Sequence, residues 1–236
     1  MNNQTFLRHI KNQQNHWWFQ SRKKILHQII SGINLKRFIY SLDFGSGSGV
    51  NIDMLQKYGN VDIHEKNKVA RLNIKKNYNI KKIYKSLNFK KGYYDLILIA
   101  DVLEHVEKPE KLLIILKKSL KKNGHILITV PAYQFLFSNK DITLKHYRRY
   151  ELKTLKKIIS NFKIIKISYF NTLLFIPLAI LILINKTLKR DFINDAETTP
   201  HFIINKLLYY IFSCESFLLK YFNFPFGMSI YTLVKK

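Results

Sequence analysis

Three glycines at alternate positions, directly after an apolar run, are the residues of this sequence that most suggest chemistry. Residues 42–49 read LDFGSGSG, and a short helical pattern follows them. A glycine can adopt a positive φ and lets a ligand approach the backbone closely. A buried strand, a glycine-rich turn and a helix form the first unit of a nucleotide-binding α/β sheet. The loop therefore predicts a site for an adenosine-containing cofactor.

The spacing of these glycines favours a cationic cofactor over a dinucleotide. The dinucleotide fingerprint G-x-G-x-x-G places its third glycine where this chain has Val50. Asp43, at the end of the strand, brings a carboxylate to the loop, where it would repel a pyrophosphate. S-adenosylmethionine carries a sulfonium and an ammonium group, and an acidic rim attracts both. The alternative is a glycine-rich turn that binds no ligand.

Two further carboxylates come at the ends of later predicted strands. Glu65 follows the second strand, about 20 residues after the first glycine, where a carboxylate can accept hydrogen bonds from both ribose hydroxyls. Asp62 is its rival but lies inside the strand. Asp101 follows the fourth strand, at the sheet edge where ligands bind. We predict that Glu65 and Asp101 face the cofactor; the alternative for Glu65 is a solvent-exposed turn.

Two histidines lie close in sequence to predicted site segments and are candidates for a general base. His105 lies one helical turn beyond Asp101, and His146 lies in the segment KHYRRY at residues 145–150. Near neutral pH a histidine can remove a proton from a substrate group, or it can orient that group. We predict that His105 or His146 is the catalytic base. The alternative for His105 is that it caps or packs the start of a helix.

Basic and aromatic residues near the same sheet edge are predicted to bind the substrate. Arg148 and Arg149 can pair with an anionic or phosphorylated acceptor, and Tyr133 lies in the loop after the fifth strand. Trp18 and Arg22 belong to a segment, expected to precede the first helix, that holds both tryptophans. Such a cluster closes over a cofactor, sits at a membrane interface or packs on the first helix. For the arginines, a solvated basic surface is the alternative, and no metal site is predicted.

Hydrophobic periodicity predicts that strands and helices alternate along most of the chain. The strands are expected at residues 38–43, 61–64, 82–84, 94–100, 125–130, 164–170 and 229–234. Helices are expected at residues 21–33, 68–77 and 151–161, and another from Pro109 to a stop signal at Asn123-Gly124. This alternation indicates an α/β fold with a doubly wound, mostly parallel, Rossmann-like sheet.

Size and composition fit one domain with an elaboration. The 236 residues are 47% hydrophobic, and the single cysteine, Cys214, excludes an internal disulfide and suggests a reducing compartment. Residues 1–20 lack the apolar core of a secretion signal. The chain has 40 Lys and Arg against 15 Asp and Glu, a net charge of +25. Such a charge attracts nucleic acid or anionic lipid, with a compositional bias toward lysine as the alternative.

An apolar stretch interrupts the alternation before the last strand. Residues 167–185 contain no charged residue, and residues 202–222 contain only three. We predict an apolar helical hairpin at residues 171–222, inserted into a domain formed by residues 1–170 and 223–236. Because the flanking strands belong to one sheet, the hairpin would dip into a membrane face rather than cross it once. The alternative is two helices packed on the domain or in a dimer interface.

Together these motifs resemble the class I S-adenosylmethionine-dependent methyltransferases, in a bacterial-type subgroup of the type 11/12 kind. The motifs, in chain order from about His16 to the C-terminus, are HWWF with Arg22, DFGSGSG, DVLEH, VPAY, H-x-RRY, SYFN and FPFG. The resemblance implies a sheet of seven strands with the last one antiparallel, and S-adenosylmethionine as the cofactor. Ser46 replaces a usual Cys, and Lys145 a common Gly. Leu87 follows a strand where the family often has an acid, so a backbone N–H there would contact the adenine.

We therefore expect a methyltransferase acting by in-line displacement on a small or lipid-linked acceptor, with O-methylation as the favoured chemistry. The residues expected to hold the cofactor are Asp43, Gly45, Ser46, Gly47, Gly49, Glu65, Leu87 and Asp101.

Three other functions compete with this expectation. The charge favours an RNA methyltransferase, but the chain lacks an Asn-Pro-Pro-Tyr motif and an appended nucleic-acid module. A non-enzymatic membrane-bound scaffold would keep the fold without the chemistry, and the glycine spacing disfavours a nicotinamide oxidoreductase. We expect a cytoplasmic protein, peripheral to the inner face of the membrane, with an anionic membrane surface rather than nucleic acid as its partner.

Overall fold

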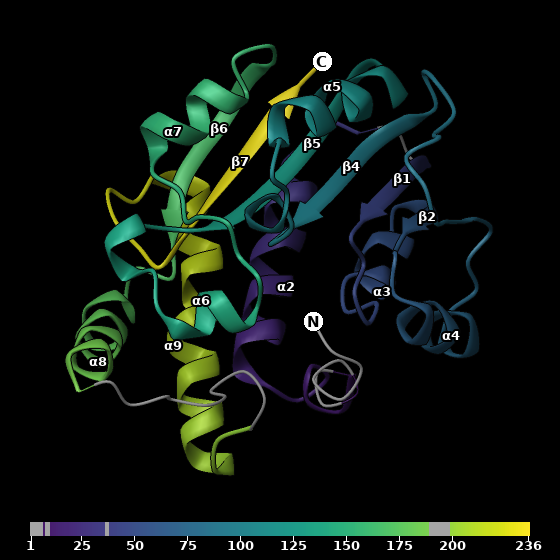
Figure 1. Ribbon diagram of the computed structural model, residues 1–236. Helices are drawn as coiled ribbons and strands as arrows, with labels where there is room; N and C mark the ends of the chain where they lie inside the picture. Colours follow the sequence, from purple (N-terminus) through teal and green to yellow (C-terminus); the bar gives the residue numbers. More distant parts are fainter. Residues whose placement is uncertain (1–6, 8–9, 36–37, 189–198) are drawn as a thin grey trace.

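A single seven-stranded sheet forms the centre of the molecule (Figure 1). The computed structural model describes residues 7, 10–35, 38–188 and 199–236. The strand order is β3-β2-β1-β4-β5-β7-β6, and β7 runs antiparallel to both of its neighbours. The predicted Rossmann-like, doubly wound sheet with an antiparallel last strand is therefore confirmed.

All seven predicted strands are present, and most of their ends fall within two residues of the prediction. Their bounds are β1 Ile39–Phe44, β2 Gly59–His64, β3 Ile83–Tyr84, β4 Tyr94–Ala100, β5 Leu120–Pro131, β6 Lys163–Phe170 and β7 Ser229–Lys235. The expected helix stop at Asn123-Gly124 is wrong, because the helix ends at Ser119 and β5 begins at the next residue. Asn123 adopts a positive φ of 66°, so its turn signal marks an irregularity inside the strand.

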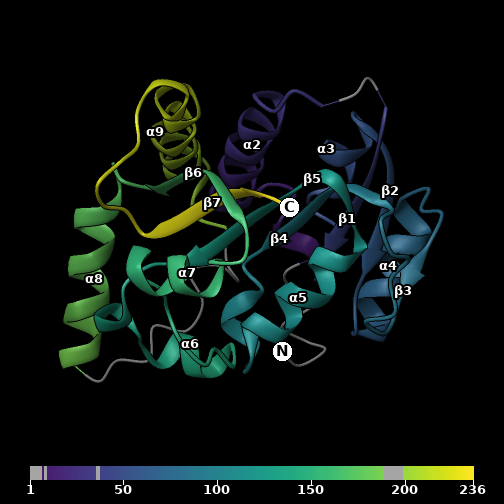
Figure 2. The same cartoon turned by 90° about the horizontal axis from the view of Figure 1, so that it is seen from above.

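Helices cover both faces of the sheet and divide the core into two layers (Figure 2). On one face lie α2 (Trp17–Ser31), α3 (Ile52–Gln56), α4 (Lys68–Asn77) and α9 (Phe202–Tyr221). On the other lie α5 (Pro109–Ser119) and α7 (Leu152–Ile158). The middle of β4 is fully buried because both of its faces are covered, as its continuous apolar run predicts.

Helix α2 begins earlier than predicted. The tryptophans lie in its first turn, and His16 is the N-cap, accepting a hydrogen bond from the backbone N–H of Trp18 at 3.2 Å. The aromatic segment therefore starts the helix instead of preceding it. Its rings pack on α9, where Trp18 stacks on Phe212 with ring centroids 5.3 Å apart. Helices α2 and α9 lie side by side in Figure 1.

The apolar stretch before β7 forms two helices, α8 (Phe175–Thr187) and α9. Helix α9 is attached to the domain by Glu215, whose buried carboxylate accepts hydrogen bonds from the backbone N–H groups of Asn171, Thr172 and Leu173. By length and composition, α9 is also the one helix among the described residues that could cross a membrane. Residues 189–198, between the two helices, lie outside the described residues.

The sheet places its chemistry at one edge. Strands β1 and β4 are parallel neighbours, with Asp43 beside Leu98, so their carboxyl ends meet. The chain leaves β1 toward β2 on one side of this pair and leaves β4 toward β5 on the other. Ligands of open α/β sheets bind at such a switch point. The glycine loop and Asp101 follow these two strands directly.

Candidate functional site

A cleft of about 2260 Å³ opens at the carboxyl ends of β1, β4 and β5. Most of the residues predicted for the site line it. These are Trp18, Arg22, Gly45, Ser46, Gly47, Glu65, Leu87, Asp101, His105, His146 and Arg149. Four others lie outside the lining: Asp43, Gly49, Tyr133 and Arg148.

The glycine loop presents open backbone to the cleft at Gly47. Its φ is +57°, and a Cβ added there would meet nothing within 4 Å. The two flanking glycines differ, because a Cβ on Gly45 would lie 2.6 Å from Val102 and one on Gly49 2.9 Å from Tyr78. Gly45 and Gly49 therefore serve close packing, whereas Gly47 leaves room for a ligand, as a cofactor cradle requires.

Glu65 closes the rim of this loop. One carboxylate oxygen accepts a hydrogen bond from the backbone N–H of Gly47 at 2.8 Å, and the other accepts one from Asn67 at 2.7 Å. The rival Asp62 is buried and accepts a hydrogen bond from the Tyr94 hydroxyl at 2.8 Å. Glu65 is thus the acid of this strand that lines the cleft, and the unused lone pairs of its two oxygens can accept hydrogen bonds from a ligand.

Asp43 lies under the loop, almost fully buried at 1% exposure. Burial raises the pKa of its carboxyl to about 7, while the charge of Arg22 opposes that rise. Ser46 spans the turn by donating its hydroxyl hydrogen to the backbone carbonyl of Asp43 at 2.8 Å. Asp43 therefore does not line the cleft. Near neutral pH its carboxyl is partly ionised, so it contributes negative charge from behind the loop.

Arg22 is a buried cation among acids. Its guanidinium forms an ion pair with Asp101 and is attracted by Glu104 and Asp43, yet desolvation lowers its pKa to about 10. Asp101 has a positive φ of 55° and also accepts a hydrogen bond from the Thr129 hydroxyl at 2.8 Å. Arg22 thus stabilises the floor of the cleft, a role that its position in the sequence does not indicate.

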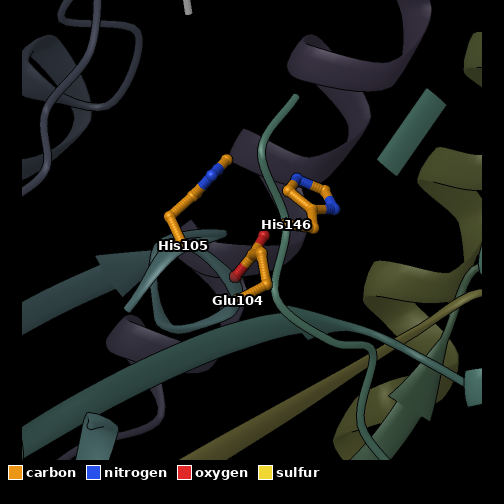
Figure 3. A group of neighbouring side chains, drawn as sticks. All are labelled: Glu104, His105 and His146. Atoms are coloured by element: carbon orange, nitrogen blue, oxygen red, sulfur yellow. The ribbon is translucent and has the colours of Figure 1, made fainter. Parts of the chain in front are cut away.

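Two histidines face each other beside this floor (Figure 3). The ring centroids of His105 and His146 are 4.5 Å apart. His105 is exposed on one side, but desolvation by the surrounding cleft walls, together with the charge of His146, lowers its pKa to about 4. Asp141 lies 2.7 Å from Nδ1 of His146 and pairs with Arg149. Burial alone would raise the pKa of Asp141, but these two hydrogen bonds hold it well below its usual value.

The remaining predicted residues divide between the cleft and its surroundings. Leu87 lines the cleft at 37% exposure. Tyr133 stacks on Tyr169 with ring centroids 5.2 Å apart, in front of the helical turn η2 (Gln134–Leu136). Arg148 is half-buried and donates to the Glu107 carbonyl at 2.9 Å. Tyr133 and Arg148 therefore support the loops around the cleft.

Three polar residues of the cleft were not predicted as site residues. Glu104 and Asn171 belong to the motifs DVLEH and SYFN, whereas Asp141 belongs to none of the motifs. Glu104 is 1% exposed, and its Oε2 has no hydrogen-bond partner among the described residues. The side-chain amide of Asn171 is fully buried and equally unpaired within the part of the chain that the structure describes. Asp141 is instead buried and paired with His146 and Arg149. Burial and pairing depend on contacts between distant residues, so they can be recognised only in the folded structure.

A family model for the methyltransferase domain matches residues 9–164, well over half of the chain. The chain belongs to this methyltransferase domain family. The predicted enzyme class, an S-adenosylmethionine-dependent methyltransferase, is thereby confirmed. No curated protein matches the chain at a significant level.

Solved structures show how widely this methyltransferase shares its fold. An S-adenosylmethionine-dependent methyltransferase from Archaeoglobus fulgidus is 19% identical with a TM-score of 0.60, covering 92% of this chain and 94% of its own. A chain from the Haloferax volcanii complex with the Trm112 methyltransferase activator is 14% identical with a TM-score of 0.62, covering 98% and 93%. Phosphoethanolamine N-methyltransferase 2 from Haemonchus contortus is 16% identical with a TM-score of 0.55, covering 90% of this chain and 52% of its own.

Proposed function

We propose that the chain binds S-adenosylmethionine along the glycine loop and passes its methyl group to a small or lipid-linked acceptor in the adjoining cleft. The observation that carries this proposal is the pairing of open backbone at Gly47 with the Glu65 carboxylate at the rim. Bound there, the cofactor supplies an electrophilic methyl group on a cationic sulfur. Asp43 and Asp101 add negative charge beneath and beside the loop, which favours a cationic ligand.

The side chains of the cleft position the acceptor and accept the proton that it loses. In-line displacement requires alignment more than acid–base strength. His146 is the better candidate base, because the Asp141 carboxylate orients its ring through Nδ1 and leaves Nε2 to accept a proton. His105 is held neutral beside it and can orient the acceptor. An acceptor hydroxyl, giving O-methylation, suits this arrangement.

The cleft wall favours an acceptor with an apolar part. Leu178, Leu181 and Ile182 of α8 line one side of the cleft. Asn171 also lines the cleft, and its amide has no hydrogen-bond partner among the described residues, so an acceptor can be apolar along its length and hydrogen-bonded at one point. Trp18 completes the enclosure from α2.

The insert at residues 171–222 supports a membrane-borne acceptor. Large apolar side chains of α8 and α9 are exposed, among them Ile176 at 62%, Phe202 at 71% and Ile203 at 68%. Lysines lie on the same helices, and the chain carries a net charge of +25, which attracts anionic headgroups. We infer that these faces lie on the cytoplasmic surface of a membrane while Glu215 keeps α9 attached to the domain.

The test of the cofactor site is calorimetric titration of the protein with S-adenosylmethionine. Glu65→Ala should weaken binding by roughly 1.5–3 kcal/mol, or about 10- to 150-fold in Kd, since a charged acceptor is lost. Glu65→Gln keeps the shape and separates charge from packing. Asp53→Ala removes an exposed acid from nearby α3 and should change nothing. An unchanged Kd in both Glu65 variants would reject the proposed site.

Methylation of RNA is the second candidate, and the net charge of +25 is the observation that favours it. Incubation of membrane, soluble and RNA fractions with labelled S-adenosylmethionine, followed by mass spectrometry, identifies the acceptor. Binding to RNA through phosphates would also weaken steeply as salt rises. Label in RNA alone would replace the lipid-linked acceptor in this proposal.

A further inference from the structure

We propose that Glu104, His105 and His146 bind a divalent transition-metal ion in the cleft. One ligand atom from each of the three residues lies within 4.8 Å of the others. Figure 3 shows the Glu104 carboxylate beside the two imidazole rings. Two imidazoles and one carboxylate, with further positions open to solvent or substrate, are a donor set that Zn²⁺ and Fe²⁺ accept in enzymes.

The buried carboxylate is the strongest sign of a ligand. Glu104 lies in the short helical turn η1 (Leu103–His105), at 1% exposure, and its Oε2 finds no partner in the described part of the chain. Taking a carboxylate out of water is costly unless a cation or hydrogen-bond donors compensate. Arg22 attracts Glu104 electrostatically, but its ion pair is made with Asp101. A cation bound at Oε2 supplies the missing partner.

His146 is oriented as a metal ligand would be. Its Nδ1 lies 2.7 Å from Oδ1 of Asp141, which also accepts hydrogen bonds from Arg149. A carboxylate on one nitrogen of an imidazole fixes the tautomer and leaves the other nitrogen to a metal. The backbone N–H of Tyr147 donates to the Glu104 carbonyl at 2.8 Å, so the His146 loop is attached to η1.

His105 completes the set from the other side. It follows Glu104 in the chain, and its ring stands at 78° to that of His146. Zinc–ligand bonds of about 2.1 Å place donor atoms roughly 3.4 Å apart in a tetrahedral site. The present separations therefore require a modest side-chain rotation, which His105 allows because the residue is exposed on the side of the open cleft.

Binding of the ion does not depend on methyl transfer, but a catalytic role for the ion rests on the proposed function. If the proposed function holds, an ion here would polarise an acceptor oxygen bound at its open position. The histidine lone pairs would then bind the ion instead of taking a proton. Activity that falls on chelation and returns with the metal alone would distinguish this role from that of a histidine base.

The test is titration of the untagged, chelator-treated full chain with Zn²⁺ by calorimetry, with Co²⁺ absorption as a second probe of coordination. We expect one ion per chain. Glu104→Gln and His146→Ala should each weaken Zn²⁺ binding at least about 100-fold, and Asp141→Asn about 10- to 100-fold. His201→Ala, which removes an exposed histidine from the start of α9, should leave the affinity unchanged.

Absence of one-to-one binding by the unmodified protein would overturn the proposal, as would full affinity in folded Glu104→Gln and His146→Ala variants. Circular dichroism and S-adenosylmethionine titration of the same samples report folding. If either variant fails to fold, His105→Gln at the more accessible ligand carries the test. Binding of S-adenosylmethionine without Zn²⁺ would reject the ion alone, and the reverse would reject only the proposed cofactor site.

Discussion

At the scale of single residues, Gly45 and Gly47 have opposite surroundings. We expect Gly47→Arg to fold but to lose S-adenosylmethionine binding, because its side chain would fill the open space over the loop; a positive φ costs only about 1–2 kcal/mol. Gly45→Ala should instead lower the melting temperature, since its Cβ would clash with Val102. Thermal unfolding and calorimetry measure the two effects. Wild-type affinity in Gly47→Arg would contradict this account of the loop.

His64 predicts a dependence of stability on pH. It is 3% exposed, stacks on Phe44 with ring centroids 4.4 Å apart, and burial lowers its pKa to about 4 from 6.5. The unfolded chain therefore takes up a proton that the folded chain refuses. This contribution to stability is present above pH 6.5 and falls as the pH drops toward 4, by about 2 kcal/mol at pH 5.

Urea unfolding across this pH range measures the effect. His64→Gln should flatten the pH dependence, whereas His201→Gln, at an exposed position, should retain it. An identical slope in wild type and His64→Gln would show that other groups account for the acid sensitivity.

The residues of the site that the sequence predicts are those that belong to short sequence motifs or follow predicted strands. The glycine loop is recognisable from a few adjacent residues, and Glu65 from its place at a strand end about 20 residues further along the chain. The ion pair of Arg22 with Asp101 joins residues 79 positions apart, so no local pattern reveals it. The role of Glu104 is likewise hidden in the sequence, since its burial and the lack of a partner for its Oε2 among the described residues depend on the packing around it.

At the scale of elements, α9 depends on one carboxylate. Glu215 accepts three backbone hydrogen bonds, at 2.6, 2.8 and 2.9 Å, from the turn after β6. We expect Glu215→Gln to lower the free energy of unfolding by about 2–5 kcal/mol, because an amide places a donor where acceptors are needed. Urea unfolding measures the loss. Cys214→Ser, at the exposed neighbouring position, is the control, and equal stability of the two variants would contradict the attachment.

Periodicity predicted the elements better than their partners. Helix α4 and strand β4 have the predicted bounds, because each carries its full pattern in consecutive residues. The apolar composition of residues 202–222 predicted a helix but not that α9 would pack along α2. That pairing arises from contacts distant in sequence, such as the hydrogen bond of 2.9 Å from the Trp17 backbone N–H to Asn205.

At the scale of the whole molecule, charge and exposed apolar helices predict binding to lipid. We expect the protein to float with vesicles containing anionic lipid at low salt, and less with zwitterionic vesicles, because headgroup charge attracts its lysines. Phe202→Asp combined with Ile203→Asp should reduce flotation. Leu72→Asp alters a 58% exposed leucine on α4 and should not. A protein that stays soluble with both lipids would reject the membrane proposal.

The two edge strands of the sheet limit how copies of this protein can associate with one another. On one margin β3 offers two residues, and on the other β6 carries Lys163 and Lys166. Short margins and lysines discourage the addition of a foreign strand, which is the first step toward fibrils. We therefore expect folded copies to associate through helical surfaces rather than through backbone hydrogen bonds at the sheet edges.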